Sequence, residues 1–368
     1  MANRAAENAD RLARSVLKDR LHLKAKENVT IETYPSALPW ATGFVREARR
    51  MGAKPLLHYE DEASYWTAVE EGHAHRIGSP SDAEWAALAD TDVYIYFWGP
   101  EDMARRLALP EKTQGSLTAF NGKWYDVAAK AGLRGARMSI ARVTERNARH
   151  WGVSRSTWEA EVLAASFRDP KTMAKDAAKV ERAFARGHEL RVRHPNGTDL
   201  RLALAGYPVH VTTGEVTPAE MKSRFGRMAN VPDGTVFVAI DESTADGEFV
   251  ANRMTTASGA PQVGGRYSLT DGALTRASFS KGGGEFRSAY AEAGAGKDHP
   301  SFIEVGLQPG VGNAPGLEEL ERGGVTFGIG GNSGFGGKGK ADFLHYLTLA
   351  GAELSVDGRT LVKGSRIR

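Results

Sequence analysis

The stretch Asn28-Val-Thr-Ile-Glu-Thr-Tyr-Pro-Ser-Ala-Leu-Pro-Trp-Ala-Thr-Gly-Phe-Val-Arg-Glu-Ala-Arg-Arg-Met-Gly-Ala-Lys-Pro-Leu-Leu-His-Tyr-Glu60 predicts a strand, a helix and a second strand. Residues 28–34 alternate in polarity and contain β-branched side chains, which favours a strand. Residues 38–51 are helical in character and end at Gly52, and residues 55–60 predict the next strand. Two strands joined through a helix pair in parallel, so this stretch predicts a parallel sheet.

The flanking sequence extends the same pattern. Residues 5–21 carry apolar side chains at helical spacing, which predicts an amphipathic first helix. A helix-like run over residues 82–89 precedes the apolar strand Val93-Tyr-Ile-Tyr-Phe-Trp98. Strands that alternate with helices predict a mostly parallel α/β domain, which we place at residues 1–150.

The second half of the chain has a different pattern. Residues 156–186 are helical in character, and hairpins with glycine-rich turns follow. Asn196-Gly197, Asp271-Gly272 and Asp357-Gly358 each lie between alternating runs, which predicts tight antiparallel turns. The fold class is therefore α/β, with a second, glycine-rich α+β domain of antiparallel strands over residues 151–368.

Composition limits the classes of function. The 48 basic and 45 acidic residues are interspersed and give a net charge of only +3, so we expect no nucleic-acid partner. The chain has no cysteine, which excludes disulfides and thiolate chemistry. Residues 1–21 lack the apolar run of a signal peptide, and no stretch reaches the roughly 18 apolar residues that a membrane span needs. We therefore expect a cytoplasmic protein with no membrane partner.

Four segments near the C-terminal end carry a family resemblance. They are Val231-Pro-Asp-Gly-Thr-Val-Phe237, Phe302-Ile-Glu-Val-Gly-Leu-Gln-Pro309, Thr326-Phe-Gly-Ile-Gly-Gly-Asn332 and Leu344-His-Tyr346. Together with Gly52-Ala-Lys-Pro55 and the order of elements, they resemble the aminopeptidase T family of metallo-aminopeptidases. The resemblance implies an aminopeptidase T-like fold, a two-metal centre in the second domain, and a homodimer that encloses the active sites in a cavity.

The resemblance also assigns the metal-binding positions, and other residue types occupy them here. The family's two glutamates fall on Thr235 and Phe302, and its histidine falls on Thr326. The phenol falls near Ser333, and the closing histidine and aspartate fall on Leu344 and Tyr346. Two metals need several fixed carboxylate and imidazole ligands, so we expect no metal and no other cofactor.

A second resemblance leads to the same expectation. The stretches 241–248 and 306–309 also resemble ring-opening dihydroxypyridine dioxygenases, which bind one iron. The iron-ligand positions of that family fall on Phe302, Leu344 and Tyr346, so the same substitutions weaken a single-iron interpretation.

Three residues near these positions are candidate catalytic groups. His345 could act as a general base, and its alternative is a hydrogen-bonded core histidine. Glu304 lies between Ile303 and Val305, where a buried carboxylate could act as acid or base and an outward-facing charge is the alternative. Tyr346 could donate a hydrogen bond to a substrate carbonyl, although aromatic packing would also explain it.

Further residues are candidates for substrate binding. Thr235, Phe302 and Thr326 follow from the resemblance, and Lys338 belongs to a glycine-rich run that could approach an anionic group. Arg253 could clamp a carboxylate or form an ordinary salt bridge. Asp241 lies in an acidic loop with Glu242, Asp246 and Glu248, which could hold a hard cation but is more often simply solvated.

The sequence therefore predicts a diverged enzyme that acts on a small amide-like or heterocyclic substrate. Acid–base chemistry by Glu304 and His345, with Tyr346 as donor, would replace the two-metal centre. One alternative is a metal-dependent aminopeptidase whose ligands have moved to Glu304, His345 and the loop around Asp241. The other alternative is a non-catalytic, small-molecule-binding dimer.

Overall fold

The chain forms two compact units, which a computed structural model describes over residues 2–222, 226–256 and 260–368. Unit 1 comprises Met1–Phe167 and Gly214–Asp233, and unit 2 comprises Arg168–Thr213 and Gly234–Arg368. These units differ from the expected division at residue 150. Residues 151–167 remain with unit 1, where the Arg20 guanidinium donates a hydrogen bond of 3.0 Å to the carbonyl oxygen of Ser166 and the Arg11 guanidinium lies over the ring of Phe167.

Unit 1 contains a parallel sheet in the order β2-β1-β3-β4-β8. Its strands are β1 (Asn28–Thr33), β2 (Lys54–Tyr59), β3 (Val93–Phe97), β4 (Arg134–Met138) and β8 (Met228–Val231). Its α-helices are α1 (Ala2–Arg14), α2 (Leu38–Arg50), α3 (Glu62–Glu70), α4 (Ala74–Ile77), α5 (Asp82–Ala89), α6 (Met103–Leu107), α7 (Glu111–Leu117), α8 (Asn121–Ala131), α9 (Glu145–Trp151) and α10 (Arg155–Ser166). Short turns of helix are η1 (Ser15–Arg20), η2 (Pro35–Ala37), η3 (Ser139–Arg142) and η5 (Glu220–Lys222).

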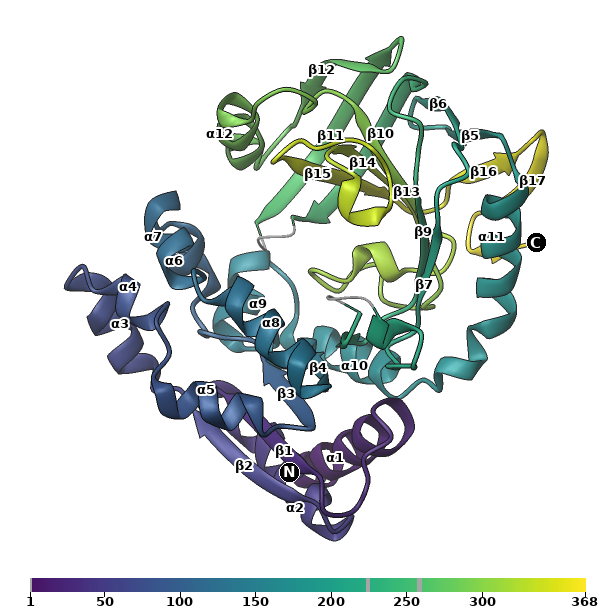
Figure 1. The fold of residues 1–368 in the computed structure, drawn as a ribbon. Coiled ribbons are helices and arrows are strands. Elements are labelled where there is room, and N and C mark those ends of the chain that lie inside the picture. Colours follow the sequence, from purple (N-terminus) through teal and green to yellow (C-terminus); the bar gives the residue numbers. More distant parts are fainter. Residues whose placement is uncertain (1, 223–225, 257–259) are drawn as a thin grey trace. The chain divides into compact units, whose positions relative to one another are not determined.

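The two faces of this parallel sheet differ in chemistry. Val29 and Ile31 of β1 and Phe97 of β3 are fully buried on one face, where Phe44 of α2 meets Phe97 edge-on at 5.3 Å. The opposite face carries polar and aromatic side chains and faces α5 and α8 (Figure 1). The period of two along a strand fixes this division, because alternate residues point to opposite faces.

Unit 2 is built mainly from antiparallel strands. Its strands are β5 (Glu189–His194), β6 (Thr198–Ala203), β7 (Val209–Thr212), β9 (Thr235–Ala239), β10 (Asp246–Thr255), β11 (Pro261–Thr270), β12 (Ala273–Ser278), β13 (Pro300–Gly306), β14 (Val325–Gly330), β15 (Leu344–Leu349), β16 (Glu353–Val356), β17 (Arg359–Lys363) and β18 (Arg366–Ile367). Its helices are α11 (Ala174–Arg186) and α12 (Gly284–Glu292), with short turns η4 (Pro170–Thr172), η6 (Glu318–Leu320) and η7 (Ser333–Phe335).

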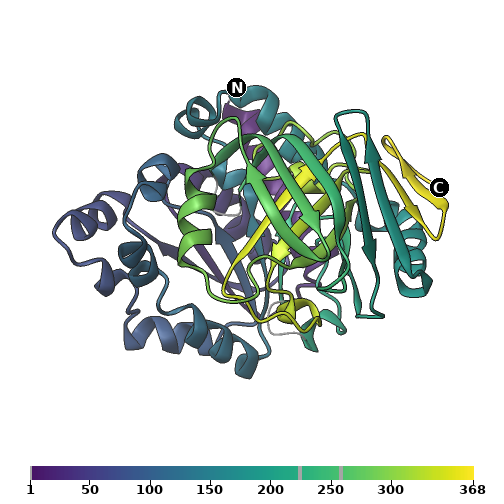
Figure 2. The ribbon, with the colours of Figure 1, turned by 90° about the horizontal axis from the view of Figure 1, so that it is seen from above.

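Two sheets of unit 2 share one hydrophobic core. The orders are β12-β11-β10-β6-β5-β16-β17-β18 and β15-β14-β13-β9-β7. Figure 2 shows the green strands β10 to β12 lying over the yellow strands of the second sheet, and Phe249 of β10 meets Phe327 of β14 at 5.6 Å. The predicted turns at 196–197, 271–272 and 357–358 each join two paired antiparallel strands, as expected.

The predicted fold class is confirmed, because a parallel α/β unit accompanies a unit of antiparallel strands. None of the helices in the described part of the chain has the length and apolar character needed to cross a membrane.

Candidate functional site

One face of the five-stranded sheet in unit 2 gathers most of the predicted site residues. Strand pairing places Glu304 directly opposite Phe237 on β9 and Thr326 on β14, and Thr326 opposite Thr348 on β15. Residues two apart along each strand share this face. We call it the Glu304 face, and its members are His210, Thr212, Thr235, Phe237, Phe302, Glu304, Thr326, Leu344, Tyr346 and Thr348.

The positions that the resemblance assigned to metal ligands fall together on this face. Thr235, Phe302, Thr326, Leu344 and Tyr346 come from β9, β13, β14 and β15, yet all point to the same side of the sheet. Ser333 lies in η7 and is exposed. Among the described residues of these strands, Glu304 is the only carboxylate on the Glu304 face.

Pairs of threonine hydroxyls satisfy one another across this sheet. The hydroxyl oxygens of Thr326 and Thr348 lie 2.9 Å apart, and those of Thr212 and Thr235 lie 3.1 Å apart. Thr326 and Thr235 are buried. A buried hydroxyl that finds a partner avoids the cost of desolvation, so these pairs are stable polar elements of the face.

Aromatic rings cover part of the Glu304 face. The Phe302 ring covers Gly328, where an added Cβ atom would come within 2.4 Å of a ring carbon. The centre of the Phe302 ring lies 6.0 Å from that of Tyr346 and 5.4 Å from that of Phe335. Phe302 therefore occupies room that a side chain on β14 would otherwise take.

An imidazole that sequence reasoning missed also lies on this face. His210 stacks on Phe237 with 4.8 Å between ring centres, and its Nε2 lies 3.0 Å from the carbonyl oxygen of Phe335. The signal was available in the alternating run Val209-His-Val-Thr212, where a polar side chain recurs at every second residue.

His345 does not join Glu304 and Tyr346. It lies on the other face of β15, is 91% buried, and forms a hydrogen bond through Nδ1 with the Tyr267 hydroxyl. Burial lowers the pKa of His345 from its usual 6.5 to about 4, so the ring is neutral near pH 7. Neighbouring residues of a strand point in opposite directions, so the structure does not bring His345 onto the face that carries Glu304 and Tyr346.

Hydrogen bonds join the acidic loop (residues 241–248) to the glycine-rich run (residues 334–341). Asp241 accepts hydrogen bonds from the backbone and hydroxyl of Ser243, at 2.9 and 2.6 Å. Glu242 accepts hydrogen bonds from the backbone amides of Lys338 and Gly339, at 2.8 and 3.0 Å. Although burial opposes it, these amides contribute to lowering the pKa of Glu242.

The other two charged candidates are Lys338 and Arg253. The side chain of Lys338 is exposed. The side chain of Arg253 lies outside the described part of the structure. Their predicted roles in substrate binding stay predictions.

The described residues also do not bring together the ligands of the alternative metal-dependent aminopeptidase, which were expected at Glu304, His345 and the loop around Asp241. Glu304 and His345 lie on opposite faces, and Glu248 of the acidic loop pairs with Arg266. Within the described residues, one group of three offers ligand atoms within 4.8 Å of one another, and it consists of His58, Glu60 and Glu84 in unit 1.

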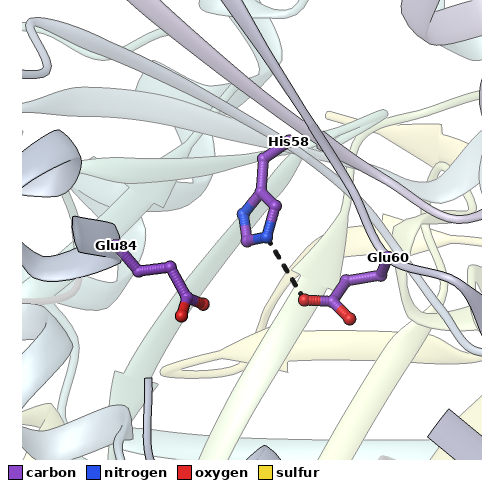
Figure 3. A group of neighbouring side chains, drawn as sticks. All are labelled: His58, Glu60 and Glu84. Atoms are coloured by element: carbon purple, nitrogen blue, oxygen red, sulfur yellow. Dashed lines mark ion pairs between the residues drawn. The ribbon is translucent and has the colours of Figure 1, made fainter. Parts of the chain in front are cut away.

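Figure 3 shows this group of three. His58 and Glu60 lie two residues apart on and just after β2, so they share a face, and their side chains approach to 3.3 Å. Glu84 comes from α5, where one of its oxygens accepts a hydrogen bond from the Ser81 amide. Two carboxylates and an imidazole could hold a divalent cation.

Two solved structures are similar to the whole chain. AmpT from Thermus thermophilus has a TM-score of 0.68 and 17% identity, with 98% of this chain and 99% of that chain covered. The 2,5-dihydroxypyridine dioxygenase from Pseudomonas putida KT2440 has a TM-score of 0.60 and 15% identity, with 100% and 98% covered. No protein-family model and no curated protein matches the chain. At these identities the likeness shows an aminopeptidase T-like fold.

Proposed function

We propose that the Glu304 face is the substrate site of an enzyme that acts on a small amide-like or heterocyclic substrate without the two-metal centre of the aminopeptidase T family. The observation that carries this proposal is the register of β9, β13, β14 and β15. It brings five positions that the resemblance assigned to metal ligands onto one face, where hydroxyl and aromatic groups surround a single carboxylate.

The proposed chemistry uses Glu304 as the acid–base group. In hydrolysis of an amide, Glu304 takes a proton from a water molecule whose oxygen attacks the carbonyl carbon, and then returns the proton to the departing nitrogen. Tyr346, on the same face, donates a hydrogen bond to the carbonyl oxygen as negative charge develops there. Phe237 and Phe302 supply apolar surface for the substrate.

We assign His345 to stability rather than to chemistry. Its Nδ1 is occupied by the Tyr267 hydroxyl, and its ring stands edge-on to Phe286 at 4.9 Å. His210 is the imidazole that shares the face with Glu304, two strands away across Phe237.

One observation favours the non-catalytic alternative, in which the chain binds a small molecule without turnover. Phe302 packs over Gly328 and is buried, so part of the face is occupied by protein side chains. A binding protein needs shape and hydrogen bonds at such a face, but no acid–base group.

Kinetics with matched variants separate these possibilities. Leucinamide and a set of cyclic amides are assayed with the wild type, Glu304→Gln and the control Glu189→Gln, whose carboxylate is exposed on β5. We expect Glu304→Gln to lower kcat by about 100-fold and the control to retain it. EDTA should leave the rate unchanged.

Three outcomes would contradict this proposal. Unchanged kcat in Glu304→Gln removes the acid–base role. Bound ligand without turnover, with an affinity that Glu304→Gln alters, favours the binding protein. Near-stoichiometric zinc, cobalt or manganese with chelator-sensitive hydrolysis favours a metal-dependent aminopeptidase. The expected homodimer and cytoplasmic location stay predictions, and light scattering of the purified protein tests the first.

A further inference from the structure

A cavity of about 700 Å³ lies within unit 1, over the face of the parallel sheet opposite α2. Alternate residues of β1 and β3 form its floor, including Glu32, Tyr94 and Tyr96. Side chains of α3, α5 and α8 line its walls. Sites for small molecules in proteins measure roughly 300–1,000 Å³, so this volume suits one small ligand.

The floor of this cavity is more polar than the faces of a typical parallel sheet. Parallel strands covered by helices on both sides are normally apolar on both faces. Here one row across the sheet is His58, Glu32, Tyr96 and Arg137, on β2, β1, β3 and β4. Polar groups retained on such a face need partners, and a ligand in the cavity would provide them.

One part of the lining is acidic. Burial raises the pKa of Glu32, although the Tyr94 hydroxyl, which donates a hydrogen bond to this carboxyl, opposes the shift. His58 and Glu60 lie at 3.3 Å, and Glu84 is adjacent. Two further carboxylates therefore lie near Glu32.

Another part of the lining is basic. The Arg137 guanidinium is held by the carbonyl oxygen of Met228 at 2.8 Å and by the Tyr125 hydroxyl. Arg106, from α6, is half-buried. Burial raises the pKa of Tyr65 and of Tyr96, and the positive charge of Arg106 opposes this rise. Over the described residues, the Arg106 side chain forms no hydrogen bond or ion pair. It is therefore available to an anionic group.

Aromatic rings connect these charged parts. Tyr94 meets Trp124 at 5.2 Å, and Tyr96 meets Trp98 at 5.4 Å, both edge-on. Tyrosine and tryptophan surfaces bind flat rings, and they also attract cations to their faces.

We propose that the cavity of unit 1 binds a small aromatic zwitterion, in which an aromatic or heterocyclic ring carries both an ammonium group and a carboxylate. The ammonium group pairs with Glu32 and its neighbouring carboxylates. The carboxylate pairs with Arg106, and the ring lies among the tyrosine and tryptophan side chains. The residues of this cavity belong to unit 1 and those of the Glu304 face to unit 2, and the proposal does not depend on the function proposed for that face.

Three probes of matched shape test the charge pattern by calorimetry on the full chain. Phenylalanine carries both charges, phenethylamine carries only the cation, and 3-phenylpropionate carries only the anion. We expect phenylalanine to bind about tenfold more tightly than either singly charged probe. Equal affinity for the three probes, or no binding of any, overturns the proposal.

Variants assign each charge to its residue. Glu32→Gln should weaken phenylalanine and phenethylamine about tenfold and leave 3-phenylpropionate unchanged. Arg106→Gln should weaken phenylalanine and 3-phenylpropionate and leave phenethylamine unchanged. The exposed Glu71→Gln serves as the control and should bind all three probes as the wild type does. Melting curves confirm that each variant folds.

A chelator distinguishes direct pairing from a metal bridge. His58, Glu60 and Glu84 could hold a divalent cation near Glu32. We expect EDTA to leave the affinity for phenylalanine unchanged. Loss of binding in EDTA that added zinc restores, or losses in Glu32→Gln that are the same for all three probes, would overturn direct recognition of the ammonium group.

Discussion

The Tyr267 hydroxyl and Nδ1 of His345 are hydrogen-bonded inside the core of unit 2. Burial raises the pKa of Tyr267 well above its usual 10 and lowers that of His345 to about 4. Both groups are therefore neutral near pH 7, so the phenol donates to Nδ1 and the imidazole proton lies on Nε2. The pair contributes a neutral polar contact among the aromatic rings of Phe279 and Phe286.

Stability should fall in mild acid because of His345. In the unfolded chain this histidine binds a proton near pH 6.5, whereas in the folded protein it does so only near pH 4. The neutral, buried His345 contributes fully to the free energy of unfolding above pH 6.5. This contribution, about 3 kcal/mol in total, is lost as the pH falls toward 4. Urea unfolding between pH 7 and pH 4 measures this slope. His345→Gln should flatten it, and the exposed control His150→Gln should not.

Gly328 and Phe302 should be energetically coupled. A Cβ atom at position 328 would meet the Phe302 ring at 2.4 Å, so Gly328→Ala should destabilise unit 2 by about 1–3 kcal/mol. Removing the ring in Phe302→Ala opens this space, and Gly328→Ala should then cost clearly less. A double-mutant cycle of unfolding free energies measures the coupling. Additive effects would mean that the ring does not occupy this position.

Two hairpin glycines with the same backbone angle should differ in their tolerance of alanine. Gly272 has φ +75° and Gly358 has φ +76°, so alanine is strained by about 1 kcal/mol at either position. At Gly272 the added Cβ would also lie 2.4 Å from the backbone of Ser243, whereas at Gly358 nothing lies within 4 Å. Thermal melting should therefore show a larger loss for Gly272→Ala. Equal losses of thermal stability in the two variants would show that the strain of the backbone angle alone sets the cost of alanine.

Glu47 of α2 should stabilise the packing of α1 against α2, alongside Asp10 of α1, which accepts hydrogen bonds from Arg46 and Arg50 of α2. The Glu47 side chain is 2% exposed, and it accepts two hydrogen bonds of 3.2 Å from Arg14 and a third from Arg50. Both arginines are more than half exposed, so solvent screening reduces the effect. We expect Glu47→Gln to lower the free energy of unfolding by about 1–3 kcal/mol. Glu71→Gln, on the surface, is the matched control, and an equal effect of both variants would refute the assignment.

The elements of unit 1 could be predicted closely where the signal was local. The strand expected at residues 28–34 is β1 (Asn28–Thr33), and the helix expected at 38–51 is α2 (Leu38–Arg50). β8 (Met228–Val231) could not be predicted as part of this sheet. It pairs with β4 only after the chain has passed through the first segment of unit 2, and no local pattern specifies a pairing over that separation.

The strands that carry the candidate residues could be predicted more directly from the sequence than the packing around those residues. The resemblance selected positions that do share a face, but it could not show that Phe302 packs over Gly328. The cavity of unit 1 was missed, although alternate polar residues in Asn28–Thr33 were a visible signal. The apolar half of this alternation predicts a strand, and its polar half, Thr30 and Glu32, lines the cavity.

The sequence by itself determined which side chains share a face, because a strand repeats every two residues whatever it packs against. That rule places His345 and Tyr346 on opposite faces of β15, and the pairing of β13, β14 and β15 then puts Glu304 on the side of Tyr346. Only the tertiary structure decided which face is core and which carries polar groups, because this depends on the elements that cover each sheet. The same alternation that buries Ile31 beneath α2 directs Glu32 into a cavity, and the packing of distant helices makes that difference.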